Sequence, residues 1–315
     1  MAIPTSLHTS DSLSAALMRM KLQAYLNITL DAGGDWAIDF AGLDGLTLNV
    51  VQKGTCWLSI EGQADSLQLS AGDCFLMTGG KPFSLATNVS LNTRTHVREL
   101  FEHQQNGVLK CQGGGDFVAV GTLFRFEGHL PAILFGRLPP VIHIASGSEQ
   151  AAVLRWSLEC FNTELREAGA GRSLMLNHLA PIMLLQTLRI YLASATREKN
   201  WLVAMYSPKL SKVLDAMHSD FKRNWSLDAL GKLANLSRSG LALSFKKMVG
   251  VAPLEYLTQW RMQVACELLQ TPGESIASIA TAVGYSSESA FSLAFNKIVK
   301  CRPGAYRKRY APDRQ

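Results

Sequence analysis

The stretch from Trp225 to Tyr306 decides the fold, because it contains one helical plan twice. Ser226-Leu-Asp-Ala-Leu-Gly-Lys-Leu-Ala234 begins with a helix-capping residue and carries apolar residues at helical spacing. A turn at Asn235-Leu-Ser237 then leads to a second predicted helix over 238–249. Ser275-Ile-Ala-Ser-Ile-Ala-Thr-Ala-Val283 repeats the plan, with a turn at Gly284-Tyr-Ser286 and a second helix over 288–299. The two capping serines lie 49 residues apart, so this part of the chain is an internal repeat.

Each copy of the repeat predicts a helix-turn-helix unit, in which the first helix braces a second one that can enter the major groove of DNA. Between the copies, Pro253 occupies a position suited to a first helical turn, and 254–269 reads as one helix. At about 1.5 Å per residue this connector is roughly 24 Å long. It could hold two reading helices on one face of a duplex, whose full turn is about 34 Å.

Charge is distributed unevenly along the 315 residues. From Pro208 onward there are 16 Lys and Arg against 8 Asp and Glu, and the preceding part has 15 against 17. The basic excess therefore coincides with the repeat and predicts a surface that binds double-stranded DNA. Two other interpretations are a merely solubilising basic surface and helical pairs that bind another protein, and the position of the charge argues against both.

The remaining composition bears on the compartment. No run approaches the roughly 18 apolar residues that a bilayer span needs, and Arg19 and Lys21 interrupt the early apolar stretch where a secretory signal would lie. Six cysteines form no C-x-x-C pair. We therefore expect a reduced, cytoplasmic protein that does not contact a membrane.

The C-terminal hundred residues resemble the AraC/XylS-type transcription regulators. The residues that carry this resemblance are Gly250-Val-Ala-Pro-Leu-Glu-Tyr-Leu257, Arg261, Ala265, Leu268, Leu269, Ser275, Ile276, Ile279, Ala280, Val283-Gly284-Tyr285, Ser289, Phe291, Phe295 and Pro303-Gly-Ala-Tyr-Arg307. The resemblance implies a DNA-binding regulator, more often an activator, with RNA polymerase as a further partner. It also implies that the reader is joined to a separate sensing or dimerising domain.

The N-terminal half begins with a predicted short helix, capped by Ser10 or Asp11, whose apolar face includes Leu13, Leu17, Met20 and Ala24. Short β-type runs separated by Gly-rich turns follow, which predicts a β-sandwich or jelly-roll barrel. These runs are 36–40, 46–51, 55–60, 67–69, 74–77, 83–86, 107–111, 117–126 and 141–144.

This half resembles a cupin-type sensing domain, on the evidence of Ala71-Gly-Asp-Cys-Phe-Leu-Met77, Gly80-Lys-Pro-Phe83 and Leu138-Pro-Pro-Val-Ile-His-Ile144. Metal-binding cupins present two close histidines, a carboxylate and a later histidine. No His-x-His pair occurs among His96, His103, His129 and His143, so we expect no metal, no cofactor and no enzymatic activity. A cupin-type metal enzyme fused to a helical domain is the alternative from a different class.

Helical periodicity returns over 149–168 and 173–195, which predicts a helical hairpin with a broad apolar surface. That surface either pairs two subunits into a homodimer or packs on the chain's own barrel, and a linker is expected at 195–207. The predicted class is thus α+β multidomain. It has a cupin-like jelly roll at 1–145, a hairpin and linker at 146–207, and an all-α double helix-turn-helix domain at 208–315, whose first helix runs to about Phe221.

Helical phase separates the inward from the outward positions of the second helices. Leu241, Phe245 and Met248, and likewise Phe291, Phe295 and Ile298, form inward stripes. The candidates for base contacts are Arg238, Ser239, Ala242, Leu243, Glu288, Ser289, Ala290, Leu293 and Asn296.

Leu243 and Leu293 depart from the resembling family, which often has Arg at both places, where a guanidinium could bind guanine. We expect these leucines to touch thymine methyl groups, and the alternative is that the helices tilt and both pack internally. Candidates for phosphate contacts lie at helix ends and beside the repeats: Ser226, Lys246, Lys247, Arg261, Ser275, Lys297, Arg302 and Arg307. Lys300 stands where the first copy has Gly250, which predicts a less tightly turned helix end.

An unknown small-molecule effector, apolar or amphipathic, is the expected input to the barrel. The residues considered for binding or redox sensing are Cys56, Trp57, Cys74, His96, Cys111 and His129. A thiol-based redox sensor is the alternative, since a cysteine near a base can react as a thiolate. Most buried cysteines, however, are inert.

Overall fold

The computed structural model describes residues 11–21, 23–42, 45–126, 130–147, 152–167, 169–194, 200–271 and 273–310. The chain divides into two compact units. The β-rich unit consists of Gln23–Arg125 and Leu138–Thr196, and the helical unit consists of Met1–Leu22, Phe126–Arg137 and Arg197–Gln315. The helical unit therefore contains two segments from the N-terminal half of the sequence.

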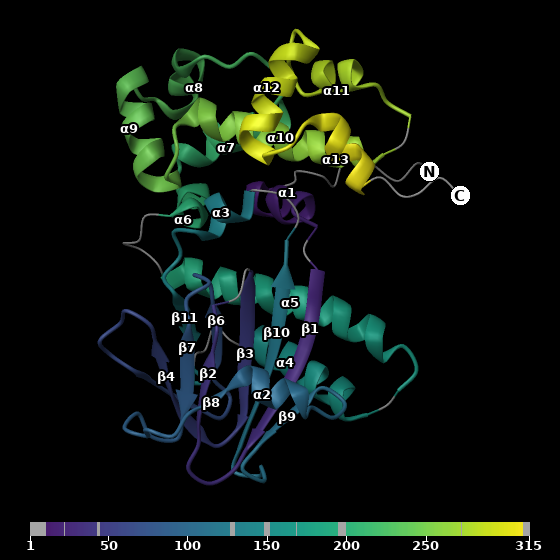
Figure 1. The fold of residues 1–315 in the computed structure, drawn as a ribbon. Coiled ribbons are helices and arrows are strands. Elements are labelled where there is room, and N and C mark those ends of the chain that lie inside the picture. Colours follow the sequence, from purple (N-terminus) through teal and green to yellow (C-terminus); the bar gives the residue numbers. More distant parts are fainter. Residues whose placement is uncertain are drawn as a thin grey trace, which may run out of the picture. The chain divides into compact units, whose positions relative to one another are not determined.

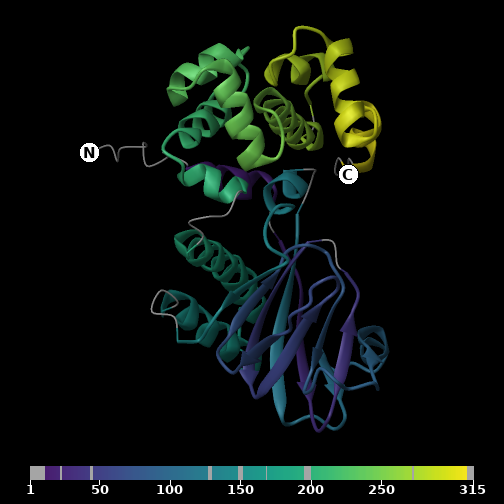
Figure 2. The ribbon, with the colours of Figure 1, turned by 90° about the vertical axis from the view of Figure 1, so that its left-hand side faces the viewer.

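The β-rich unit is built from two sheets that face each other (Figure 2). The six-stranded sheet has the order β11 (Val141–Ile144), β6 (Cys74–Met77), β3 (Leu46–Lys53), β10 (Phe117–Arg125), β1 (Gln23–Ala32) and β9 (Val108–Cys111). The five-stranded sheet has the order β5 (Leu67–Ser70), β4 (Thr55–Ile60), β7 (Phe83–Ala86), β2 (Ala37–Phe40) and β8 (Thr95–His96). This arrangement confirms the predicted two-sheet β fold.

Alternating side chains from both sheets fill the space between them. In β1, for example, Leu30 and Ala32 belong to this core while Asp31 between them is half-buried, as a period of two requires. Trp36 and Phe117, whose ring centroids are 5.0 Å apart, are among the largest side chains of the core between the sheets. Strands such as β4 and β11 occupy the predicted runs because buried apolar residues alternate along them with less buried ones.

Strand β1 corrects the predicted extent of the first helix. Helix α1 (Ser12–Arg19) is capped by Asp11, but it ends before Ala24, which belongs to β1. β1 pairs antiparallel with β10 from Gln23↔Arg125 to Ala32↔Phe117, and parallel with β9. Because these backbone hydrogen bonds come from partners some 80 to 100 residues away in sequence, helical spacing around Ala24 was outweighed by tertiary pairing.

The predicted helical hairpin is present as α4 (Ala152–Arg166) and α5 (Arg172–Ser194). Both helices lie on the outer side of the six-stranded sheet (Figures 1 and 2), and α5 contacts β1 and β11. Leu184 and Leu188 of α5 are fully buried, so part of the apolar surface packs on the chain's own sheet. Trp156 and Leu174 remain 58% and 63% exposed. The short helix α2 (Val97–Glu102) completes this unit.

The helical unit contains α1, α3 (Leu130–Phe135), α6 (Trp201–Tyr206), α7 (Leu210–Ser219), α8 (Leu227–Ala234), α9 (Arg238–Val249), α10 (Pro253–Gln270), α11 (Ile276–Ala282), α12 (Glu288–Val299) and α13 (Pro303–Tyr310). Helix α6 lies where a linker was predicted over 195–207. Trp201 and Leu202 are at most 1% exposed, and burial of these apolar side chains explains why the segment is helical and packed. None of the described helices combines the length and apolar character that a bilayer span requires.

Helix α10 forms the central support of this unit. The Tyr256 hydroxyl accepts a hydrogen bond from the Trp201 indole N–H at 3.0 Å and lies 2.8 Å from Nε2 of His218. His218 in turn stacks on Trp260 with ring centroids 3.6 Å apart. Burial lowers the pKa of His218 to about 3, so its imidazole is neutral in the folded protein.

Candidate nucleic-acid interface

The two copies of the repeat fold as two helix-turn-helix pairs, α8 with α9 and α11 with α12. Ser226 and Ser275 cap the first helices, each through a side-chain oxygen that accepts a backbone N–H three residues on, at 3.1 and 3.0 Å. A left-handed residue then turns the chain, Asn235 at φ 51° in the first copy and Gly284 at φ 84° in the second. The same local chemistry therefore builds both pairs.

The second helices bury the predicted inward stripe. Leu241 and Phe245 in α9, and Phe291 and Phe295 in α12, are all 0% exposed. Phe245 meets Tyr256 edge to face at 5.7 Å, and Phe295 meets Tyr306 in the same manner, also at 5.7 Å. Met248 and Ile298, at the ends of the stripes, are only half-buried. The phase of each second helix about its axis is thus fixed by aromatic and aliphatic burial.

The opposite face of each second helix is open to solvent. Leu243 is 74% exposed and Leu293 is 75% exposed, so the alternative in which both leucines pack internally is excluded. Arg238, Ser239, Glu288, Ser289, Ala290 and Asn296 are exposed as well, and Ala242 is half-buried. Every base-contact candidate therefore has a side chain that a groove could reach. Their roles in base contact stay predictions.

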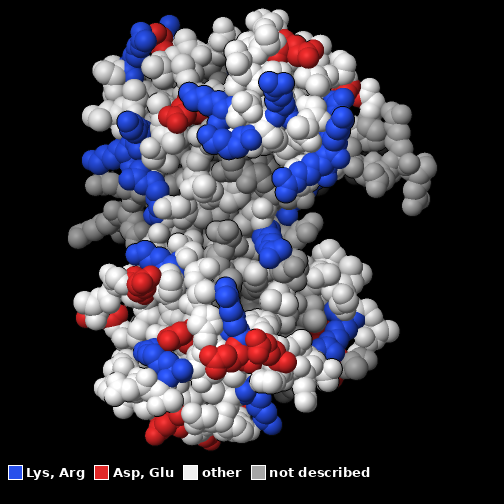
Figure 3. All heavy atoms as spheres, in the orientation of Figure 1, with Lys and Arg blue, Asp and Glu red and all other residues white. Residues whose placement is uncertain are grey.

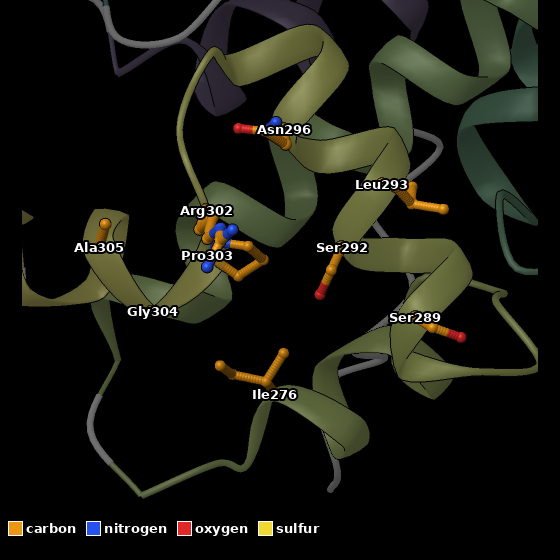
Figure 4. A pocket seen from close by; sticks show the side chains of 9 residues that line it. All are labelled: Ile276, Ser289, Ser292, Leu293, Asn296, Arg302, Pro303, Gly304 and Ala305. Carbon is orange, nitrogen blue, oxygen red and sulfur yellow. The ribbon is translucent and has the colours of Figure 1, made fainter.

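A hollow of about 550 Å³ lies beside α12 and separates it from the amino-terminal turns of α11 and α13 (Figure 4). Ser292 and Ile276 point toward this hollow, and Arg302 and Pro303 close its other side (Figure 4). Its lining is Ile276, Ser289, Ser292, Leu293, Asn296, Arg302, Pro303, Gly304 and Ala305. Sequence reasoning missed Ile276 and the 303–305 turn, because only the folding of α13 against α12 brings them to this surface.

Basic side chains accompany these faces. Lys246, Lys247, Lys297 and Arg302 are exposed, and Figure 3 shows Lys and Arg over much of the visible face of the helical unit. On the same view, the β-rich unit carries a band of acidic side chains. A duplex would therefore be attracted to the helical unit.

Arg261 and Arg307, which were predicted to contact phosphates, instead have guanidinium atoms engaged or buried within the protein. The Arg261 guanidinium donates to the backbone carbonyl oxygens of Phe221 at 2.7 Å and Arg223 at 2.9 Å, and it lies over the ring of Tyr285. It braces the chain before α8 against the second turn. Arg307 has its Nε and Nη2 atoms buried with no hydrogen-bond partner among the described residues, so these atoms cannot reach a phosphate. Helix packing places both guanidiniums inward, which sequence could not show.

The carboxyl ends of α9 and α12 have the same geometry, contrary to the looser end predicted for the second copy. Gly250 has φ 98° and its N–H donates to the Lys246 carbonyl at 2.9 Å. Lys300 also adopts a left-handed conformation, with φ 61°, and donates to Asn296 at 3.1 Å. The lysine thus takes a left-handed conformation that residues with a Cβ atom disfavour.

The candidates for sensing are dispersed in the β-rich unit. Cys56, Cys74 and Cys111 are buried, and burial raises the pKa of Cys56 and Cys74 to about 12 and that of Cys111 above its usual value. Their thiols are therefore poor sources of the reactive thiolate. Trp57 is half-buried on β4, and His96 caps α2 through Nδ1, which accepts from the Arg98 N–H at 3.2 Å. His129 lies outside the described residues.

No group of three or more His, Cys, Asp and Glu side chains in the described parts of the chain is placed to hold a metal ion. His143 instead pairs with Asp73 at 3.2 Å. Asp73 also accepts the Ser70 and Ser146 N–H groups, and these bonds help to hold its pKa below the ordinary value although burial opposes them. This carboxylate and histidine tie the turn before β6 to the end of β11.

Comparison with known proteins identifies one family in each half of the sequence. A family model described as cupin matches residues 11–193, and one described as a helix-turn-helix domain matches 230–309. A relative from Streptomyces antibioticus, described as an AraC-like transcription regulator, is 34% identical over 303 residues, which cover 96% of this chain and 100% of the relative. One of the same description from Streptomyces lividans is 35% identical over 299 residues, covering 95% and 98%.

A solved transcriptional regulator with an AraC-type DNA-binding domain, from Chromobacterium violaceum, is 29% identical. The match covers 35% of this chain and 99% of that one, with a TM-score of 0.33.

Proposed function

Because the chain belongs to the AraC-like transcription regulators, with a cupin domain before its helix-turn-helix region, we propose that α9 and α12 read adjacent major grooves of a specific DNA site. The observation that carries this proposal is the paired exposure pattern. Each helix buries two large apolar residues completely and presents a leucine three-quarters exposed on its outer face. In both copies the outer face is therefore available for a groove.

The base contacts we propose are mixed polar and apolar. Leu243 and Leu293 touch thymine methyl groups, while Arg238, Ser239, Glu288, Ser289 and Asn296 supply hydrogen bonds to base edges. The small side chains of Ala242 and Ala290 leave room for each helix to approach the base edges closely. Lys246, Lys247, Lys297 and Arg302 contact phosphates and give affinity rather than sequence choice.

The N-terminal turns of α8 and α11 add backbone N–H groups to the phosphate contacts. Ser226 and Ser275, which cap these turns, are exposed, so a phosphate oxygen could approach each of them. The hollow beside α12 lies between Arg302 and Ser292 and can receive part of one DNA strand (Figure 4).

For regulation we propose that the β-rich unit senses a small apolar or amphipathic effector and that the response is transcriptional activation through RNA polymerase. The core between the sheets is filled by large side chains such as Trp36, Phe75 and Phe117, so an effector there must displace them. An effector changes DNA binding only if it binds one arrangement of the chain more tightly than another.

We also propose that the protein acts as a homodimer. Helices α4 and α5 present apolar side chains to solvent: Val153 is 51% exposed, Trp156 58%, Leu174 63% and Met175 46%. Apolar patches of this kind are commonly protein contacts. A second copy would cover them and place four reading helices on the DNA.

The proposal is tested with the full chain and duplexes selected from a random pool. We expect one enriched site, and a logarithm of affinity that falls linearly with the logarithm of salt concentration. Lys247→Gln and Lys297→Gln, at equivalent positions of the two copies, should each reduce that slope by about 1.

Lys81→Gln and Lys110→Gln, exposed on the β-rich unit, are the matched controls and should leave the slope unchanged. If no duplex binds at low ionic strength, or if the controls change the slope as much, the proposed interface is wrong.

A further inference from the structure

The segment Phe126–Arg137 belongs to the helical unit, although it lies in sequence between strands β10 and β11 of the β-rich unit. Its helix α3 contacts α6 and α10, and α3 is drawn beside α6 in Figure 1. Leu130 and Leu134 are 0% exposed, and Phe135 packs against Phe126 with ring centroids 5.0 Å apart. The segment is therefore a built-in part of the core that supports the reading helices.

One end of the segment contacts the first recognition helix. The Arg137 guanidinium donates to the backbone carbonyl oxygens of Lys247 at 3.2 Å and Lys246 at 3.4 Å, in the last turn of α9. A side-chain carbon on Gly250, which ends this helix, would lie 3.0 Å from Cδ of Arg137. A cation at the carboxyl end of a helix satisfies exposed carbonyls and interacts favourably with the helix dipole. Arg137 thus caps α9 from outside the repeat.

The other end of the segment reaches the second recognition helix. Phe126 lines a hollow of about 540 Å³ together with Ile298, Val299 and Lys300, which form the carboxyl end of α12. Cys266 and Tyr306 line the same hollow. One end of this segment therefore contacts the carboxyl end of α9 through Arg137, and the other end lines a hollow with the carboxyl end of α12 through Phe126.

A second segment of the helical unit, α1, is also connected by the chain to the β1–β10 strand pair. Gln23, the first residue of β1, is directly paired with Arg125, the last residue of β10. Helix α1, just before β1, is held in the helical unit: Arg19 forms an ion pair with Glu267 at 2.8 Å and lies over the Trp260 ring. At this end of the β1–β10 pair, the chain therefore connects β1 to α1 and β10 to the segment 126–137.

From this geometry we propose that the segment Phe126–Arg137 sets the position of both recognition helices, with Arg137 as the positioning residue for α9. We propose further that the β1–β10 strand pair controls this segment. Thr122 of β10 donates to the Asn27 side chain of β1 at 2.8 Å, so the two strands are also joined by side chains. A change in strand pairing would be passed on by the covalent chain to the ends of α9 and α12. The proposal rests on the proposed DNA-reading function.

The test uses the full chain with Arg137→Met, which keeps a long side chain but cannot donate to the carbonyls. Hydrogen exchange without DNA should become about two- to fivefold faster at residues 246–250, as loss of a helix-end cation predicts. Exchange at the equivalent residues 296–300 of the second copy should not change. Arg98→Met, an exposed arginine of α2, is the control, and Arg137→Lys should restore part of the protection.

DNA binding supplies a readout that a general loss of stability would not imitate. The selected site is compared with two versions in which the first or the second half-site is scrambled. For Arg137→Met, scrambling the half-site read by α9 should cost less than it does for the unmodified protein, and scrambling the other should cost the same. Equal losses at both half-sites, or unchanged exchange at 246–250, would overturn the role of Arg137.

Control by the strand pair is tested with Thr122→Val, which removes the bond to Asn27. Exchange at 246–250 should change in the unmodified background and should not change when Arg137 is already replaced by Met. If Thr122→Val has no effect on 246–250, or the same effect in both backgrounds, the strand pair does not act through this segment. Failure of the unmodified protein to bind any duplex would instead reject the DNA-reading function, because the exchange experiments need no DNA.

Discussion

Replacing Leu243 and Leu293 by alanine should weaken DNA binding by removing contacts to thymine methyl groups. The two side chains are 74% and 75% exposed, so neither contributes substantially to the folded core. Complete burial of a leucine is worth about 2 kcal/mol, and a groove that covers about half of the side chain gives about 1 kcal/mol. Each substitution should therefore lower affinity about fivefold, and the pair about 25-fold if the two contacts are independent.

The assay compares duplexes that carry thymine or deoxyuracil at the enriched positions, because deoxyuracil lacks only the 5-methyl group. One buried methyl is worth about 0.8 kcal/mol, so deoxyuracil should cost the unmodified protein about fourfold at each contacted position. Leu243→Ala should abolish that difference at its own half-site and leave it intact at the other. Fluorescence anisotropy with labelled duplexes measures all four combinations.

Val89→Ala is the control, since Val89 is 46% exposed but lies in the β-rich unit and outside the proposed dimer surface. It should bind both duplexes as the unmodified protein does. The thymine-methyl interpretation is refuted if the unmodified protein does not distinguish the two bases. It is refuted equally if Leu243→Ala and Leu293→Ala retain the full distinction, which would mean that the leucines are solvated and the methyl groups are read by other residues.

Two further predictions concern stability. The pKa of His218 is lowered from 6.5 to about 3 by burial, so the unfolded chain takes up the proton first; stability should be fully present above about pH 6.5 and fall as the pH falls toward 3. At about pH 5 the free energy of unfolding is about 2 kcal/mol lower because of this group. The urea midpoint of His218→Gln should therefore depend less steeply on pH than that of the unmodified protein. An equally steep dependence would exclude His218 as the cause. Lys300→Gly should stabilise the protein by about 1 kcal/mol, because glycine adopts the left-handed φ of 61° without strain, and Gly250→Ala should destabilise it. The thermal unfolding midpoints of both variants measure these effects. A lower midpoint for Lys300→Gly would show that the lysine side chain stabilises the helix end more than the backbone conformation strains it.

The sequence predicted features that depend on local chemistry. Capping serines, helical phase and the left-handed turn residues are decided within a few positions, and Phe245 and Phe295 accordingly face inward as predicted. The exposure of Leu243 and Leu293 follows from the same phase. Short strands were also predictable, since alternating burial along β4 or β11 is visible in their own residues.

Features that depend on distant partners were not predictable. The guanidinium of Arg261 could be assigned to a phosphate from its charge, but it is used by carbonyls about forty residues earlier in the chain. Lys300 predicted a loose helix end, but it adopts the same left-handed conformation as Gly250. In each case the local preference was a few tenths to about 1 kcal/mol, which tertiary contacts readily exceed.

The composition of the helical unit follows the same principle. Position in sequence assigns α1 and α3 to the N-terminal domain, and their apolar residues would suit its core equally well. The structure instead places Leu130 and Leu134 on α3, which contacts α6 and α10 in the helical unit, and it places Arg19 over Trp260. A fragment starting at Pro208 would also lack Trp201, whose indole N–H donates to Tyr256. That fragment would expose apolar surface of α10 and leave the Tyr256–His218 pair without its third member. Since α10 contacts both α9 and α12, we expect the proposed DNA-binding surface to need the segments of the helical unit that precede Pro208, and we expect the fragment to bind DNA more weakly than the full chain.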